Sequence, residues 1–190
     1  MILQKNQDVP KRRKKGEYRK FVHEYHDNIA GQELSLLDRL KGLRELNIYC
    51  AVLLSGDGIF ADCLRKNGFE VKYAPLHRLG VKSVFSYLKT IIGIRRIIIE
   101  GQFSLIHCSG AYPNQYSLIA ARLCGRPCIV HLNSTIYDRR ALSINLVHHA
   151  DFIFTVSDAV RQKVINTINI PSNRIMTIYC GVQDCGTQNY

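Results

Sequence analysis

The chain has 190 residues, of which 46% are hydrophobic and 22% charged, and its formal net charge is +11. This length suits one ordinary domain, and this balance can bury a hydrophobic core, which excludes a wholly disordered protein. The sequence contains no run of about 18 apolar residues, and its first 20 residues are polar and basic, so it predicts a cytoplasmic protein without a spanning helix or a secretory signal.

The positive charge is concentrated at the N-terminus. Residues 1–20 carry eight lysines and arginines against two acidic residues, a net charge of +6. We interpret residues 1–17 as a basic disordered leader, which is either simply solvated or held to an anionic membrane surface at about 1 kcal/mol per cation. The same charge would suit nucleic acid, but no nucleic-acid-binding motif follows it, so we expect no nucleic-acid partner.

After the leader, short apolar runs alternate with longer amphipathic ones. The apolar runs predict strands at 20–23, 47–54, 69–74, 104–108, 127–132, 152–156 and 175–179. The segments between them predict helices at 33–46, 59–66, 81–100, 114–124, 141–149 and 158–168. In the first helix, Leu34, Leu37, Leu40 and Leu43 recur every three residues and predict its buried face.

This alternation predicts an α/β domain over residues 18–183, followed by a tail at 184–190. We expect a Rossmann-like, doubly wound, mostly parallel sheet with helices on both faces. Ligands of such sheets bind beyond the carboxyl ends of the strands. The loops at that edge contain Asp, Asn, Ser, Gly and His residues, which suit hydroxyl-rich or phosphorylated ligands.

The seven cysteines are scattered, odd in number and mostly inside apolar runs, which predicts buried reduced thiols. Cys124 and Cys128 form a Cys-x3-Cys pair, but two further ligands at a suitable spacing are missing. His23 and His26 are also three apart, and their alternatives are a metal pair, a ligand-lining role for His26, or simple solvation. We expect no metal site.

Several stretches, in this order and spacing, resemble a known family. They are AGQELSLLDRLKGL at 30–43, SLIHCSG at 104–110, AARLCGRPCIVHLNS at 120–134, ADFIFTVSDAVRQKVI at 150–165 and IYCGVQ at 178–183. Together they resemble the N-terminal, acceptor-side domain of GT-B glycosyltransferases of the family 4 type. The resemblance implies retaining hexosyl transfer, as in polysaccharide biosynthesis, from a nucleotide-sugar co-substrate to a glycan or lipid-linked acceptor, with no other cofactor.

The resemblance also implies roles for individual residues. Ala30, Gly31 and Gln32 would face the donor phosphates, because a helix N-terminus that begins with glycine suits a diphosphate; the alternative is a plain helix cap. His131 would be catalytic at the junction of sugar and acceptor, where the alternative is a satisfied structural histidine. The acceptor-binding residues would be His26, Asp27, Asn28, Ser109 and Asn133.

The second domain of such enzymes, which binds the nucleotide-sugar and carries a Glu-x7-Glu pair, has no counterpart in these 190 residues. We therefore expect a truncated or half enzyme, with little activity until a donor-binding domain or subunit completes it. The sheltered cleft that stabilises charge during transfer needs both halves.

A rival function is a non-catalytic, membrane-associated binding module. The helix predicted at 81–100 combines isoleucines with Lys82, Lys89, Arg95 and Arg96. This pattern suits either a packed helix with solvated cations or an interfacial helix, peripheral at the inner face of the cell membrane.

Overall fold

The computed structural model describes residues 18–24, 29–76, 83–134 and 142–179. The strands are β1 (Arg19–His23), β2 (Tyr49–Leu54), β3 (Glu70–Tyr73), β4 (Leu105–Ser109), β5 (Cys128–Leu132), β6 (Phe152–Thr155) and β7 (Ile175–Thr177). The helices are α1 (Gly31–Glu45), α2 (Ile59–Lys66), α3 (Val84–Glu100), α4 (Ala111–Leu123), α5 (Leu142–Val147) and α6 (Asp158–Ile168), with a 3-10 turn at Ser172–Arg174.

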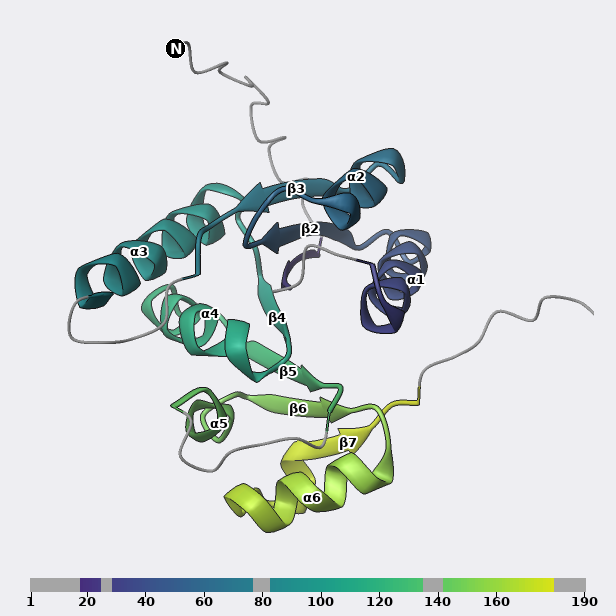
Figure 1. Cartoon of the computed structure of the whole chain (residues 1–190), viewed down its shortest axis with the longest axis vertical. Helices are drawn as coiled ribbons and strands as arrows, with labels where there is room; N and C mark the ends of the chain where they lie inside the picture. Colours follow the sequence, from purple (N-terminus) through teal and green to yellow (C-terminus); the bar gives the residue numbers. More distant parts are fainter. Residues whose placement is uncertain (1–17, 25–28, 77–82, 135–141, 180–190) are drawn as a thin grey trace, which may run out of the picture.

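All strands join one seven-stranded sheet in the order β3-β2-β1-β4-β5-β6-β7, and each neighbouring pair is parallel (Figure 1). The chain winds outward from β1 in one direction to β3, crosses back through α3, and then continues from β4 to β7. The predicted Rossmann-like, doubly wound architecture is therefore confirmed.

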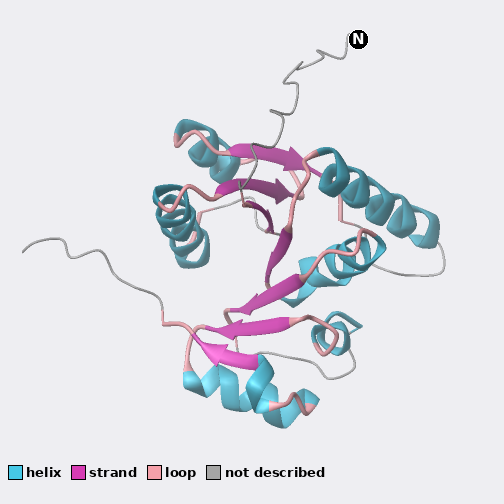
Figure 2. Ribbon diagram, turned by 180° about the vertical axis from the view of Figure 1, so that it is seen from behind, coloured by secondary structure: helices cyan, strands magenta, loops and turns pink. Residues whose placement is uncertain are grey.

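The two faces of the sheet carry separate hydrophobic cores. Helices α1 and α2 pack on one face through a cluster that includes Val22, Leu40 and Phe60. Helices α3, α4 and α5 cover the opposite face, where Phe21 and Ile106 belong to a larger cluster. Figure 2 shows the same division from behind, with α1 and α2 together on one side of the sheet.

Helix α1 buries only part of the stripe that the leucine spacing predicted, namely Leu37 and Leu40. Leu36, Leu37 and Leu40 are buried, whereas Leu34 is 51% exposed. A spacing of three residues drifts around a helix with 3.6 residues per turn, so a leucine at every third position cannot keep to one face. The predicted burial of Leu34 was wrong, whereas the predicted helix at 33–46 is confirmed as α1.

Helix α1 lies beside β1 and β2, and no helix among the described residues covers its side of the sheet over β5, β6 and β7 (Figures 1 and 2). Parallel sheets normally have both faces covered. On the α1 side of β5 and β6 the sheet therefore borders a surface pocket, and His131 and Phe154 line this pocket.

Some expectations about single residues and segments need adjustment. The predicted helix at 114–124 begins at Ala111, with Pro113 in its first turn, where proline is tolerated.

The described free cysteines are buried at positions 50, 108 and 128 and partly exposed at positions 63 and 124, so the expectation of burial holds for the first three. Cys180 and Cys185, the leader at 1–17 and the tail at 184–190 lie outside the described residues. In the part of the chain that is described, no helix has both the length and the apolar character needed to span a bilayer.

Candidate functional site

The side chain of Gln32 lies at the carboxyl edge of the sheet, held by two buried groups. Its Nε2 donates to both carboxylate oxygens of Glu24, at 3.1 Å each, and approaches Ser109 Oγ at 3.4 Å. Glu24 follows β1 and is fully buried, and Ser109 ends β4 with 2% of its surface exposed. These contacts fix the first turn of α1 to the ends of the two central strands.

The N-terminus of α1 faces solvent directly beside this contact. Ala30 and Gly31 are exposed, and the Glu33 carboxylate accepts a hydrogen bond from the Ala30 backbone N–H at 2.9 Å. A Cβ added to Gly31 would have no neighbour within 4 Å, so this turn has open space in front of it. The first-turn N–H groups have no intrahelical acceptor and, with the helix dipole, suit an anion.

His131 lies in the same row of the sheet as Ser109. The register pairs Ser109 with His131 and His131 with Phe154, so all three side chains point to the α1 side. The His131 ring is 3% exposed, and its Nδ1 accepts a hydrogen bond from the Arg39 guanidinium of α1. The ring lies beneath Arg39, so a ligand reaches it only if the Arg39 side chain moves.

The other histidines near this edge are neutral. Burial lowers the pKa of His23 to about 3, and its Nδ1 lies 2.7 Å from Ser117 Oγ on the far face of the sheet. Burial, followed by the positive charges of Lys20 and Arg39, lowers the pKa of His107 well below its ordinary value. Among the described residues, no three His, Cys, Asp or Glu side chains are grouped to hold a metal ion.

Comparison with protein families shows the family to which the chain belongs. The model of Glycosyltransferase Family 4 matches residues 29–184, which is most of the chain. The chain belongs to Glycosyltransferase Family 4. Its fold is that of an N-terminal GT-B domain of the family 4 type, as the sequence resemblance predicted.

Solved structures share the fold of this family 4 chain at low sequence identity. The Anabaena protein HepE, solved in complex with UDP and glucose, gives a TM-score of 0.72 at 19% identity, covering 87% of this chain and 45% of HepE. A glycosyltransferase from Rickettsia africae gives 0.73 at 18% identity, covering 88% and 44%. The lipopolysaccharide outer core galactosyltransferase WaaB gives 0.65 at 14% identity, covering 85% and 45%. No curated protein sequence matches the chain significantly.

The family 4 chain thus spans about 45% of the length of HepE. Of the predicted site residues, the structure brings Gln32 against Ser109, with Ala30 and Gly31 adjacent in the same turn. Asn133 follows β5, and its Nδ2 is buried with no hydrogen-bond partner among the residues that the structure describes. The predicted acceptor residues His26, Asp27 and Asn28 lie outside the described residues.

Two residues at this site were missed by the sequence analysis. Glu24 directly follows the apolar run at 21–23, and a charged residue at a strand end is the signal that would have pointed to it. Arg39 comes seven residues after Gln32, which is two helical turns and therefore the same face of α1. Because Gln32 and Arg39 lie on the same face of the helix, the helical periodicity would have predicted that Arg39 also faces the sheet.

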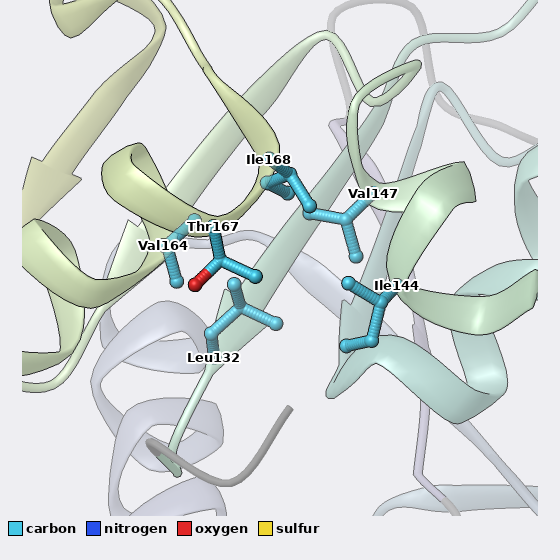
Figure 3. A pocket seen from close by; sticks show the side chains of 6 residues that line it. All are labelled: Leu132, Ile144, Val147, Val164, Thr167 and Ile168. Atoms are coloured by element: carbon cyan, nitrogen blue, oxygen red, sulfur yellow. The ribbon is translucent and has the colours of Figure 1, made fainter. Parts of the chain in front are cut away.

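A second cavity, between α5, α6 and β5, is unsuited to a ligand. It has a volume of about 10 Å³ and is lined mainly by apolar side chains: Leu132, Ile144, Val147, Val164, Thr167 and Ile168 (Figure 3). A cavity needs roughly 10–15 Å³ and several polar partners to hold even one water. We attribute it to imperfect packing on the face opposite His131.

Proposed function

We propose that the chain is the acceptor-binding half of a nucleotide-sugar-dependent glycosyltransferase, which needs a donor-binding domain or subunit for turnover. The observation that carries this proposal is the family match over residues 29–184. Its support in the site is the exposed N-terminus of α1 beside Gln32, at the edge of the sheet where ligands of doubly wound folds bind.

In this proposal the donor diphosphate lies against the first turn of α1, at Ala30, Gly31 and Gln32. The backbone N–H groups and the helix dipole supply the attraction. Glu24 and Ser109 are positioning residues, because they hold the Gln32 amide and are themselves buried. Asn133, which follows β5, remains a predicted acceptor contact, and His131 remains the predicted residue of the reaction centre. Retention of configuration and hexosyl transfer remain implications of the family.

The test measures donor binding and turnover by the chain alone. UDP-glucose is titrated into the ¹⁵N-labelled chain, and free UDP is assayed in parallel with and without sugar acceptors. We expect weak binding that shifts the amide resonances of residues 30–33, and no UDP release above background. Gly31→Glu should abolish these shifts, because it places a carboxylate before the helix N-terminus without a steric clash. Gly93→Glu, at an equally open glycine of α3, is the matched control and should leave them unchanged.

Tight binding of UDP-glucose that survives Gly31→Glu would contradict the proposal, since this chain would then hold a complete donor site elsewhere. Efficient UDP release by the chain alone would contradict the need for a second half. If UDP-glucose shifts only the amide resonances of residues far from α1, the donor phosphates do not bind at the turn of residues 30–32.

A second candidate function is peripheral association with an anionic membrane, and the surface of α3 favours it. Phe85, Leu88 and Ile92 are 88%, 49% and 63% exposed and follow one another at helical spacing. Lys89 and Arg95 are exposed on the same helix. An apolar stripe beside cations is the pattern of a helix that lies in the bilayer interface.

Co-sedimentation with vesicles separates the contributions of the leader and of α3. The full chain should bind vesicles that contain phosphatidylserine and not vesicles of phosphatidylcholine alone. Removing residues 1–17 tests the leader, and Phe85→Ser with Ile92→Ser tests α3. Leu123→Ser, at a 57% exposed leucine of α4, is the control for loss of exposed apolar surface. Binding that none of these changes reduces would refute both membrane contacts.

A further inference from the structure

A pocket of about 590 Å³ lies on the uncovered side of the sheet, beneath the C-terminal half of α1. Its walls are mainly apolar, and Leu43, Phe154 and Ile178 belong to them. Its floor is formed by side chains from three strands, which include Lys20, His107 and His131. A concave, mostly apolar pocket with a few converging polar groups has the general form of a small-molecule site.

The floor of this pocket carries the positive charge of Lys20, which has no carboxylate partner among the described residues. Among the described residues, Lys20 forms no ion pair, and Arg39 of α1 lies close enough to lower its pKa further. Cys50, the β2 neighbour of Lys20 in the sheet, has a pKa raised to about 11 by burial and stays a neutral thiol. Glu45 lines the rim, where it is exposed to solvent. A mostly buried ammonium group in this setting is unfavourable by itself.

The two histidines of the floor add donors that lack acceptors. Because His131 Nδ1 accepts from Arg39, the neutral ring carries its proton on Nε2, which is buried with no hydrogen-bond partner in the described structure. Both ring nitrogens of His107 are also buried and find no partner in the described part of the chain, so one N–H is unsatisfied there in either tautomer. The two rings stack with centroids 6.0 Å apart, so both lie in the same part of the floor. Unsatisfied buried donors are rare and unfavourable.

We propose that this pocket binds an amphiphile with a single anionic headgroup, such as a carboxylate or a phosphate monoester. Once the Arg39 side chain moves off the His131 ring, the headgroup takes the position between Lys20, His107 and His131. There it supplies both the missing negative charge and the missing hydrogen-bond acceptors. The apolar body lies along Leu43 and Phe154. This pocket shares His131 with the proposed reaction centre but does not include the exposed turn at Gly31, and binding of its ligand is measured without sugar transfer.

Isothermal titration calorimetry on the full chain with sodium octanoate tests the proposal. We expect one octanoate per chain, no binding of octylammonium, which has the same body and the opposite charge, and much weaker binding of acetate, which lacks the body. Octyl phosphate and inorganic phosphate distinguish the two headgroups and the need for the body in the same way. Equal binding of octanoate and octylammonium, or of octanoate and acetate, would overturn the proposal.

Two pairs of variants locate the site. Lys20→Met should weaken octanoate binding at least tenfold, whereas Lys163→Met, the same change at an exposed lysine of α6, should leave it unchanged. Gly42→Leu fills the pocket from α1, where a Cβ meets nothing within 4 Å, and should abolish binding. Gly93→Leu on α3 is its control. Unchanged binding in either Lys20→Met or Gly42→Leu, or an equal loss in their controls, would refute the site.

Discussion

Replacing Lys20 by methionine is expected to stabilise the chain at neutral pH, and to lose this effect in alkali. Burial, with a smaller effect of the nearby Arg39, lowers the pKa of Lys20 from its ordinary 10.5 to about 8. Below pH 8 the group is protonated in both the folded and the unfolded chain, and the folded chain then bears the full penalty of a buried ammonium group. Between pH 8 and 10.5 only the unfolded chain keeps the proton, so the penalty disappears as the pH rises.

The size of the effect follows from the lowered pKa. One pKa unit corresponds to about 1.4 kcal/mol, so the fall from 10.5 to about 8 corresponds to about 3 kcal/mol. Methionine keeps the apolar stem and removes the charge. Lys20→Met should therefore raise the free energy of unfolding above that of the parent chain by up to about 3 kcal/mol at pH 7. At pH 10 this gain should be smaller than at pH 7 by about 2–3 kcal/mol.

Urea unfolding followed by circular dichroism at pH 7 and pH 10 measures this difference. Comparing the variant with the parent chain at each pH cancels the titration of all other groups that the substitution does not touch. Lys163→Met makes the same change of charge at an exposed position of α6 and should show no pH-dependent difference. If Lys20→Met shifts stability equally at both pH values, the ammonium group is solvated in the folded chain and the reasoning fails.

Three further predictions concern the same edge of the sheet. The pKa of His23, lowered to about 3, means that protonation opposes folding as the pH falls below 6.5, so His23→Asn should move the acid-unfolding midpoint to lower pH, followed by circular dichroism. Glu33→Ala removes the acceptor of the Ala30 N–H and should cost about 1 kcal/mol in urea unfolding, while leaving the fold intact. Gly110 has a φ of 111°, so Gly110→Ala should destabilise the start of α4 by about 1–3 kcal/mol, and an unchanged thermal midpoint would contradict this.

The fold was predictable because its signals are local and repeated. The apolar runs at 47–54 and 104–108 became β2 and β4 within a few residues, since a strand buried on both faces must be apolar throughout. The alternation of such runs with amphipathic segments leaves few topologies other than a doubly wound sheet. Helix boundaries were less predictable: the helix predicted at 114–124 begins at Ala111, because proline is accepted in a first turn and Pro113 does not interrupt it.

The site was predictable only in part, because its contacts join residues that are distant in the sequence. The family resemblance implied a phosphate-facing helix N-terminus at Gly31, with a plain helix cap as the alternative. Nothing local indicated that Gln32 would contact Glu24 and Ser109, the latter 77 residues away. For His131 the sequence left a role at the reaction centre and a structural role as alternatives, and nothing local indicated that Arg39 would contact its ring. The position of an arginine side chain across a sheet depends on which helix covers that part of the face, and this information is not in the residues near His131.

Lys20 and His107 are two pocket residues that the sequence analysis did not single out. Each lies inside a strand, next to residues of the hydrophobic core. In the sequence, Lys20 looks like the last cation of the basic N-terminal stretch, and His107 looks like an ordinary interruption of an apolar run. Strand alternation places both on the α1 side of the sheet, where no described helix covers β5 to β7. A cation and two imidazoles with unsatisfied donors persist there at a cost to stability. A ligand or covering group that supplies negative charge removes that cost, so anion binding at this face and the instability that Lys20→Met relieves have one physical origin.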